Sequence, residues 1–445
     1  MRMKFNKSSQ LLLVSAASLL VAGLVTACGT LTVDFVFVSS SKAAGANNYG
    51  EIDVEEINSE SGYMRHIPTS PFPSGGRNPV AETVSSDNTN LYVLNQDDNS
   101  IVQFIIGNDG KLYPQNTTNT PGIYPVAMTV NGKNLFVVDT YQPLPTCSTA
   151  APCSGSVAVY PITASSSVPP SDALGTPVAN GNVNYWPLCL TGYASATNTA
   201  TCNLNGAGAA DLIEPTGINV LASGADAYVT AYDSTARANY IFGFSVGSGG
   251  ALTPLNSGAP LAGGPIAEGS CSNAFLNAPY VLGTCPSAIA SDPTNSFVYV
   301  TDAANGIVLE YSVGSSGLLT QLGGGSIQSG NQPSAIVVDP KFPYVYVTNA
   351  LDSTVTAYSM SNGVLSSLGT YATGSEPIAL GIDPSTSHFL FTANYLGSGV
   401  SGTVTGFELN STAGTLVNTQ NSPYTVNAFP TAVAAIPHGT SPASK

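Results

Sequence analysis

Short segments rich in apolar and β-branched residues recur along most of the chain, separated by turn residues. Seven of them share one pattern: an apolar residue, then an aromatic residue, then further β-branched or small residues. Their aromatic residues are Phe37, Tyr92, Phe136, Tyr228, Tyr299, Tyr346 and Phe391. Runs of this length, bounded by Gly, Pro, Asn and Asp, are typical of β-strands. Their recurrence along the chain predicts an all-β protein built from repeated units.

A second kind of segment begins with proline and precedes most of the aromatic segments. These prolines are Pro79, Pro125, Pro215, Pro286, Pro333, Pro377 and Pro430. A small residue stands two places after each of them, namely Ala81, Ala127, Gly217, Ala288, Ala335, Ala379 and Ala432. A third apolar segment follows the aromatic one, as at 101–106 and 307–313, and a looser fourth segment usually follows a glycine. Four short strands in a unit of about 45 residues describe one blade of a β-propeller.

The residue types fit the wedge shape of such a blade. Blades pack face to face around an axis, so only alanine or glycine fits near the axis, and aromatic residues fill the wider gap farther out. A β-sandwich also alternates apolar and polar residues, but it does not explain a sevenfold proline and small-residue register. We therefore expect a seven-bladed β-propeller with four antiparallel strands in each blade.

The two ends of the repeat complement each other. The first aromatic strand, around Phe37, has no proline strand before it, and the last proline strand, from Pro430, has no aromatic strand after it. We expect the C-terminal strand to become the inner edge of the N-terminal blade, because this closure removes free sheet edges. Two intervals exceed the repeat, after Tyr160 and after Val246. We interpret both as insertions, and an eighth, degenerate blade within residues 163–213 is the alternative.

The first residues have the features of a secretory signal. A basic start is followed by an apolar stretch too short for a comfortable membrane span and then by small residues. The sequence Val25-Thr26-Ala27-Cys28 resembles the bacterial lipobox, and this resemblance implies that Cys28 is lipidated and becomes the first residue. An ordinary signal with a chance cysteine is the alternative. The domains expected are a signal peptide at 1–27, a lipidated short tether at 28–32, the propeller at 33–437 and a tail at 438–445.

Cysteine usage also favours export. Six cysteines remain besides Cys28, and they fall into close pairs: Cys147 with Cys153, Cys189 with Cys202, and Cys271 with Cys285. An even number in short local loops suits an oxidising compartment, so three local disulfides are expected. Metal binding is the alternative, but no histidine lies near these cysteines and no paired CxxC spacing occurs.

The net charge of the chain limits the classes of partner that it can bind. The formal net charge is −15, and removal of the basic leader makes the rest more acidic. Such a surface repels nucleic acid and anionic lipid. We therefore expect a monomer that meets the membrane only through its lipid anchor, at the outer membrane and periplasm or at the cell surface.

Polar residues end most of the aromatic strands at one rim of the expected ring. They are Asn95, Asp139, Asp302, Asn349 and Asn394. A ring of amides and carboxylates is suited to binding a sugar, and a structural cation such as calcium is compatible with converging oxygens. The alternative is that these side chains cap turns by bonding their own backbone. No dedicated cofactor and no separate metal site are expected.

The strands VYVTD at 298–302 and VYVTN at 345–349, with SDP and VDP after the proline strands, carry a family resemblance. They resemble the YVTN-repeat surface proteins and the seven-bladed lactonase-like family, over nearly all of the chain that follows Cys28. This resemblance implies a propeller, either a binding module or an enzyme. Lactonases of the related family use histidine, arginine and glutamate around the channel, so residues of these types are the catalytic candidates that the resemblance implies.

Glu82 is the candidate carboxylate, because it stands three places after Pro79, where the other copies of the repeat are apolar. Arg77 and Arg237 fall in predicted loops at the face of the ring where the channel opens, called the top face. They complete the candidate catalytic set. The histidines are expected away from that face, in the outer strand of the first blade, in a turn of the opposite face and in the tail: His66, His388 and His438. The leading hypothesis is accordingly an envelope binding or adhesion module that recognises carbohydrate or protein through its top-face loops. The alternative is a lactonase-type hydrolase of the 6-phosphogluconolactonase-like family, acting at the channel mouth.

Overall fold

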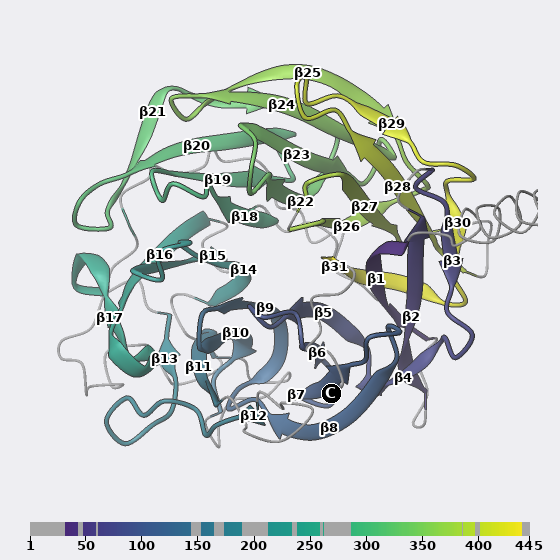
Figure 1. Cartoon of the computed structure of the whole chain (residues 1–445). Helices are drawn as coiled ribbons and strands as arrows, with labels where there is room; N and C mark the ends of the chain where they lie inside the picture. Colours follow the sequence, from purple (N-terminus) through teal and green to yellow (C-terminus); the bar gives the residue numbers. More distant parts are fainter. Residues whose placement is uncertain are drawn as a thin grey trace, which may run out of the picture.

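Seven antiparallel sheets form a closed ring around a common axis (Figure 1). The computed structural model describes residues 32–42, 48–58, 61–143, 153–163, 173–188, 212–233, 238–258, 261, 286–384, 386–396 and 401–437. Helical structure in these residues is confined to two short 3-10 turns, η2 (Ser248–Gly250) and η3 (Leu255–Gly258). None of the helices in these residues is long and apolar enough to cross a bilayer. The predicted seven-bladed β-propeller is confirmed.

Blade 1 combines both ends of the described chain, in the order β31-β1-β2-β3 with β4 also paired to β2. Its strands are β31 (Phe429–Pro437), β1 (Thr32–Ser41), β2 (Tyr49–Asn58), β3 (Met64–His66) and β4 (Phe72–Arg77). β31 is antiparallel to β1, with Phe37 opposite Ala434 and Ser40 opposite Pro430. The predicted closure of the ring by the C-terminal strand is therefore confirmed.

Blades 2 to 4 follow in chain order, each with its first strand innermost. Blade 2 contains β5 (Pro79–Val84), β6 (Asn90–Asn95), β7 (Ser100–Ile106) and β8 (Leu112–Asn119). Blade 3 contains β9 (Ile123–Asn131), β10 (Asn134–Tyr141), β11 (Ser156–Thr163), β12 (Ala173–Leu174) and β13 (Trp186–Pro187). Blade 4 contains β14 (Ile213–Val220), β15 (Asp226–Asp233), β16 (Ala238–Val246) and β17 (Leu252–Pro254).

Blades 5 to 7 complete the ring. Blade 5 contains β18 (Ala288–Ser291), β19 (Phe297–Asp302), β20 (Ile307–Val313) and β21 (Leu319–Gln328). Blade 6 contains β22 (Pro333–Val338), β23 (Tyr344–Asn349), β24 (Thr354–Ser361) and β25 (Val364–Ala372). Blade 7 contains β26 (Pro377–Ile382), β27 (Phe389–Asn394), β28 (Thr403–Leu409), β29 (Leu416–Asn418) and β30 (Tyr424–Thr425).

The long interval between Tyr160 and Pro215 extends blade 3. β12 and β13 lie within this interval, and both pair with β11. In the described part of the interval no further sheet forms, so the two short strands lengthen the outer edge of an existing blade. This arrangement supports an insertion rather than an eighth blade.

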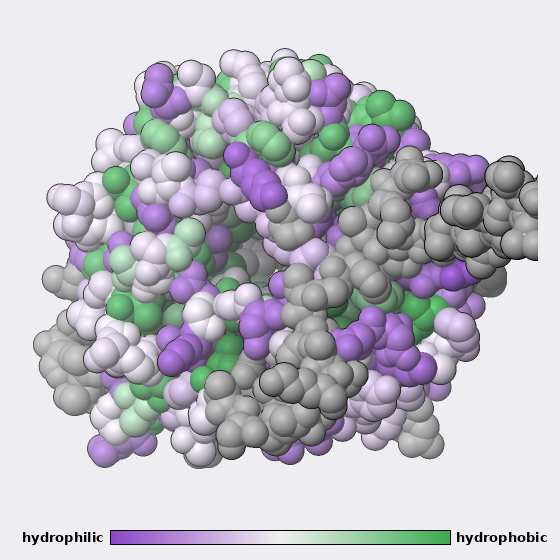
Figure 2. Space-filling view, in the orientation of Figure 1, coloured by the Kyte–Doolittle hydropathy of each residue, from purple (hydrophilic) through white to green (hydrophobic). Residues whose placement is uncertain are grey.

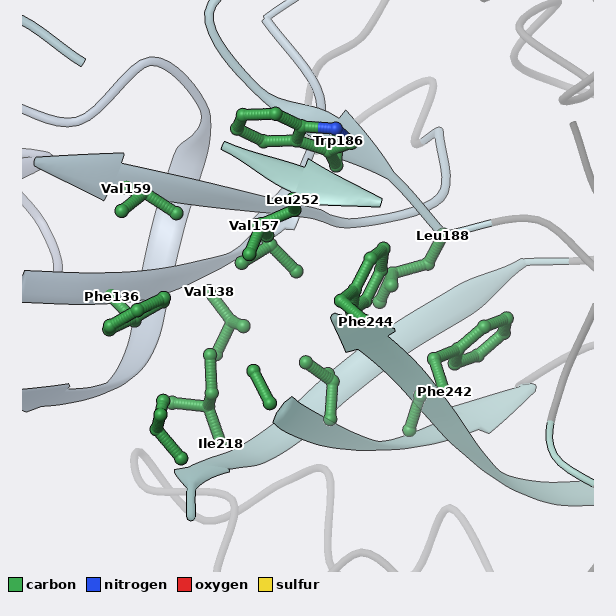
Figure 3. Packing of buried hydrophobic residues seen from close by; sticks show 14 of the residues in the cluster. Phe136, Val138, Val157, Val159, Trp186, Leu188, Ile218, Phe242, Phe244 and Leu252 are labelled. Carbon is green, nitrogen blue, oxygen red and sulfur yellow. The ribbon is translucent and has the colours of Figure 1, made fainter. Parts of the chain in front are cut away.

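The core consists of separate apolar clusters, one between each pair of neighbouring blades. The cluster between blades 3 and 4 joins Phe136 and Trp186 to Ile218 and Phe244, and all four are at least 92% buried (Figure 3). Burying one large apolar side chain contributes about 1.5–3 kcal/mol, so each blade interface is held by many such contributions. Because every blade has two apolar faces, stability requires a closed ring.

The small residues of the repeat lie near the axis and the aromatic residues lie farther out, as the wedge shape of a blade predicts. A Cβ atom on Gly217 would lie 3.4 Å from the side chain of Ile289 in the next blade, which leaves little room near the axis. Farther out, Tyr228 is fully buried and its hydroxyl donates to the carbonyl of Gly317, also in the next blade. Tyr299 makes the same bond to Gly363. In blades 4 and 5 the second-strand tyrosine therefore ties the blade to the outer hairpin of its neighbour.

Candidate functional site at the channel mouth

The innermost strands all start at the same face of the ring, and this face is called the top face below. Figure 2 shows that the surface is hollowed at the centre of the ring, where the innermost strands of Figure 1 meet. The residue just before the first proline of each innermost strand stands at the rim of this hollow. The described members of this pre-proline ring are Asn78, Tyr124, Glu214, Gln332, Glu376 and Phe429. They stand at the start of the innermost strands, and all of them except the buried Gln332 are partly exposed.

The backbone at these positions has an unusual and repeated conformation. Four of the six residues have a positive φ, with values of 52° at Asn78, 56° at Tyr124, 57° at Gln332 and 58° at Glu376. A shift in strand register, which marks a β-bulge, follows the proline in blades 2, 6 and 7, and the same shift occurs in blades 1, 3 and 4. Bulges re-aim side chains and are frequent beside functional sites. Left-handed backbone at a residue with a side chain costs roughly 1–3 kcal/mol and persists only where the surroundings enforce it.

A glycine three places before the proline helps to enforce this conformation. A Cβ atom on Gly122 would lie 2.4 Å from Cβ of Asp139, and one on Gly374 would lie 2.7 Å from Nδ2 of Asn394. Gly76 packs in the same way against Asn95, and Gly330 against Asn349. The polar residue that ends the second strand thus lies directly beneath a Gly-x-x-Pro loop. This recurrent Gly-x-x-Pro spacing was visible in the sequence but was not used to predict the site.

The five polar side chains predicted to bind ligand, Asn95, Asp139, Asp302, Asn349 and Asn394, are fully buried. Asn349 donates to the hydroxyls of Thr354 and Thr356, and Asn394 donates to those of Thr403 and Thr405. Asp302 accepts from the backbone of its own turn, which is the capping alternative. Ligand binding by these residues stays a prediction, and at Asp302, Asn349 and Asn394 it requires that a ligand replace internal hydrogen-bond partners.

Two groups of the mouth combine aromatic rings with a half-buried carboxylate. In the first, the Tyr141 hydroxyl is hydrogen-bonded to Glu214. Burial, together with the charge of Glu214, raises the pKa of Tyr141 to about 12, so the phenol stays protonated and keeps a donor for the carboxylate. The ring of Tyr124 stands edge-on to that of Tyr141, with centroids 6.3 Å apart. These residues join blades 3 and 4, and Glu214 directly follows the first insertion.

The second group joins blades 7 and 1. The rings of Tyr395 and Phe429 lie with centroids 5.3 Å apart and planes tilted by 30°. The backbone N–H of Tyr395 donates to the carbonyl of Glu376, which holds the backbone of Tyr395 beside the loop that carries the carboxylate. Burial raises the pKa of Glu376. The rim therefore carries two half-buried carboxylates, and its six described members include no lysine or arginine.

Arg77 lies on the top face but already has a partner. Its Nε donates to Asp98 at 2.7 Å, and its backbone N–H donates to the same carboxylate at 2.7 Å. This pairing holds the pKa of Asp98 below its usual value. An anionic substrate group would have to compete with Asp98 for Arg77.

Glu82 lies between blades 1 and 2. The hydroxyl of Ser39 on β1 donates to its carboxylate at 2.5 Å. Burial raises the pKa of Glu82 to about 7, although the bond from Ser39 works in the opposite direction. Glu82 and Arg77 thus have different partners in different surroundings. Arg237 lies outside the described residues.

The remaining candidates of the sequence are only partly within the described chain. Cys28 and five of the six other cysteines, Cys147, Cys189, Cys202, Cys271 and Cys285, lie outside it. Cys153 is buried at the start of the segment that leads to β11. The disulfide pairs and the lipidation therefore stay predictions.

The described histidines lie away from the mouth. His66 lies on β3, the outer strand of blade 1, where it faces Glu55 at 3.0 Å, and His388 precedes β27 and faces Glu408 at 3.5 Å. His438 lies outside the described residues. In the described ranges no three His, Cys, Asp or Glu side chains are grouped as a metal site. The expectation about a structural cation is left as a prediction.

The sequence of residues 284–377 matches the family described as lactonase, 7-bladed β-propeller. The whole architecture is similar to that of a candidate 6-phosphogluconolactonase from Bacteroides fragilis, with a TM-score of 0.64 and 18% identity. That similarity covers 92% of this chain and 99% of the other. The chain has the lactonase-like propeller fold.

The lactonase-like propeller is also similar to the periplasmic gluconolactonase of Pseudomonas aeruginosa. The TM-score is 0.63 at 16% identity, over 91% of this chain and 99% of the other. No curated protein was found to be similar in sequence. At these identities the solved structures establish a shared fold, and the residues of the mouth must carry any statement about activity.

Proposed function

We propose that this lactonase-like propeller hydrolyses a neutral sugar lactone at its channel mouth. The observation that carries the proposal is the Tyr141–Glu214 pair, a half-buried carboxylate held by a phenol at the rim of this fold. The names of two solved relatives by fold, a 6-phosphogluconolactonase and a gluconolactonase, supply the substrate class, a sugar lactone. Of the two hypotheses from the sequence, the comparisons therefore favour the hydrolase over the binding module.

In the proposed reaction Glu214 acts as the general base. Its carboxylate takes a proton from a water molecule, the water oxygen bonds to the lactone carbonyl carbon, and the bond from that carbon to the ring oxygen breaks. The ring oxygen receives the proton, so the product is a hydroxy acid and no further reactant is needed. Tyr141 positions the carboxylate, and Tyr124 and the Tyr395–Phe429 pair offer apolar surface to the substrate. General acid–base catalysis contributes typically 10²–10⁴-fold.

The charge of the rim favours an unphosphorylated substrate. Glu214 and Glu376 are the charged members of the described pre-proline ring, and Arg77 is engaged by Asp98. A phosphate group would meet like charge at the mouth, which disfavours it by electrostatic repulsion.

The experiment compares turnover of glucono-1,5-lactone with its spontaneous hydrolysis in a pH-stat. We expect Glu214→Gln to lower kcat at least about 100-fold. The matched control is Glu408→Gln, at an exposed carboxylate on β28 that faces His388 and not the mouth, which should keep kcat within about twofold of the parent. An unaltered protein that binds the lactone or a neutral oligosaccharide without turnover would overturn the hydrolase and support the binding module.

We further propose that the protein is an exported lipoprotein attached through Cys28, with the mouth facing away from the membrane. β1 is antiparallel to β31, so β1 starts beside Pro437 and ends beside Pro430. Pro430 lies at the top face, and β1 therefore starts at the opposite face. Cys28 precedes Thr32 by four residues, which span at most about 14 Å. A lipid at Cys28 would therefore hold the opposite face against the membrane. Reporter residues introduced on intact cells at Asp97, in a top-face turn, should be labelled much faster than at Thr294, in a turn of the opposite face; equal labelling would contradict this orientation.

A further inference from the structure

A second cleft lies at the outer edges of blades 1 and 7, away from the pre-proline ring. It encloses about 350 Å³ and is lined by Glu56, Asn58, Ser61, Tyr63, Arg65 and Gln420. This volume is at the lower end of the range of small-molecule sites. None of these residues takes part in the mouth described above.

The polar wall of the cleft is fixed by internal hydrogen bonds. Asn58 Oδ1 accepts from the backbone N–H and from the hydroxyl of Ser61, both at 3.0 Å. The backbone N–H of Gln420 donates to the Ser61 carbonyl at 3.2 Å, so blade 7 is tied to the turn of blade 1. Such a wall is preorganised, and little conformational entropy is lost when a ligand binds to it.

Tyr63 supplies an exposed aromatic surface in the same cleft. Its side chain is 39% exposed, and its ring stands edge-on to that of Tyr424 with centroids 6.2 Å apart. Tyr424 is itself fixed, since its hydroxyl contacts the Gln420 carbonyl and accepts from the backbone N–H of Met64. An immobilised ring with a free surface is suited to stacking against the apolar face of a ligand.

The charges of the cleft balance each other. Arg65 is 61% exposed at its side chain and pairs with Glu56, whose Oε1 accepts from Arg65 Nε at 2.6 Å. An anionic ligand would have to displace Glu56, and a cationic ligand would have to displace Arg65. The balance favours an uncharged ligand, and the guanidinium, the carboxylate and the Gln420 amide remain able to bond hydroxyl groups.

We propose that this outer cleft is a binding site for a neutral saccharide. Sugars combine an apolar C–H face, which Tyr63 would cover, with a rim of hydroxyls, which Arg65, Glu56 and Gln420 would bind. The proposal is independent of the proposed hydrolase activity, because it uses other residues on another part of the ring.

The test is isothermal titration calorimetry of the full protein with cellotetraose, maltotetraose and mannotetraose. We expect at least one of these neutral sugars to bind, and Tyr63→Ala to weaken its affinity at least about tenfold. Tyr63→Phe keeps the ring and should bind within about threefold of the parent. Tyr113→Ala removes another exposed tyrosine, on the outer strand of blade 2, and is the matched control that should change nothing.

Two results would overturn the proposal. One is the absence of binding by all three sugars. The other is sugar binding that Tyr63→Ala leaves intact and Glu214→Gln abolishes, since this would place the sugar at the mouth. Turnover of glucono-1,5-lactone by Tyr63→Ala, measured in parallel, should equal that of the parent if both proposals hold. A parent protein without turnover that still binds sugar through Tyr63 would refute the hydrolase alone.

Discussion

Replacing Glu82 by glutamine should make the protein more stable, and the gain should grow as the pH rises from about 4.5 to about 7. The carboxyl group of Glu82 is buried between blades 1 and 2, and its pKa is raised from 4.5 to about 7. In the unfolded chain the same group ionises near 4.5, so between these two values the folded protein holds a proton that the unfolded chain releases. The free energy of unfolding contributed by this group is therefore fully present below about pH 4.5, and it is lost as the pH rises to about 7.

The size of the effect follows from the shift. One pKa unit corresponds to about 1.36 kcal/mol, so a shift of this size corresponds to about 3 kcal/mol over the whole range. Glutamine can still accept the hydrogen bond from Ser39 with its amide oxygen, and it has no charge to bury. The isoelectric point of about 4.3 makes the most acidic part of the range unsuitable for measurement. Between pH 5.5 and 8.5 we expect the stability of Glu82→Gln relative to the parent to rise by about 2 kcal/mol.

Equilibrium unfolding in urea at several pH values measures this difference. Far-UV circular dichroism follows the sheets, and the fluorescence of Trp186, the single tryptophan of the chain, follows the interface of blades 3 and 4. Coincident curves would justify a two-state treatment. Other buried carboxyls with raised pKa values, such as Asp34 at about 8 and Asp139 at about 7, titrate equally in both proteins and cancel in the difference.

Glu408→Gln, at an exposed carboxylate on β28, is the control and should leave the pH dependence unchanged. A Glu82→Gln protein whose stability relative to the parent does not vary with pH would refute the reasoning. It would mean that the carboxyl has the same pKa in the folded and unfolded chains. A variant destabilised equally at every pH would instead assign Glu82 a hydrogen-bonding role that glutamine cannot replace.

Four further predictions concern the fold. Deleting residues 429–445 removes β31 and exposes the edge of β1, so the truncated protein should aggregate or lose cooperative unfolding in thermal denaturation; a truncated protein as stable as the parent would show that the ring closes differently. Tyr228→Phe loses the hydroxyl bond to Gly317 and should cost about 1 kcal/mol in urea unfolding, whereas Tyr113→Phe, at an exposed site, should cost nothing measurable. Gly363→Ala should cost at least about 2 kcal/mol, because φ is +83° and the new Cβ would lie 2.2 Å from Phe297, whereas Gly323→Ala meets no atom within 4 Å and should be neutral. Intact-mass analysis of the exported protein should show three disulfides in local pairs, and free thiols or pairing between distant loops would contradict this framework.

The fold could be predicted from the sequence because each of the seven blades requires the same residue types at the same positions. Wedge packing requires a small residue near the axis and an aromatic residue farther out, and both repeat in the chain at a fixed distance from a proline. The tyrosine bonds to glycine carbonyls, such as Tyr299 to Gly363, could have been expected from the glycine that precedes the fourth strand. The glycines that accept these bonds belong to the next blade, however. Comparing the sequences of the repeat units does not show which residues of neighbouring units are in contact.

The candidate site was harder to predict, for a physical reason. Glu82 stood out because it departs from an apolar pattern, but a departure identifies an unusual environment and not its location. The structure places it at a blade interface, where a bond from Ser39 and a raised pKa accommodate it. Glu214 did not stand out, because the type of residue before the proline varies around the ring. A position without a pattern gives no signal in a search for repeats.

The variation at the pre-proline position distinguishes residues that the ring needs for packing from residues that can differ between blades. The glycine of each Gly-x-x-Pro loop is required by contact with a buried polar side chain, as Gly374 is by Asn394. The proline begins the innermost strand, and a bulge follows it. In blades 2, 3, 6 and 7 the residue just before the proline is held at a positive φ, whereas blades 1 and 4 have no glycine at the matching place. The residue type before the proline varies in both groups: Tyr124 and Glu376 follow the glycine, and Phe429 and Glu214 do without it. A rim assembled in this way acquires chemistry without altering the ring that supports it, so the pre-proline residues are where lactonase-like propellers of the same architecture should diverge in substrate.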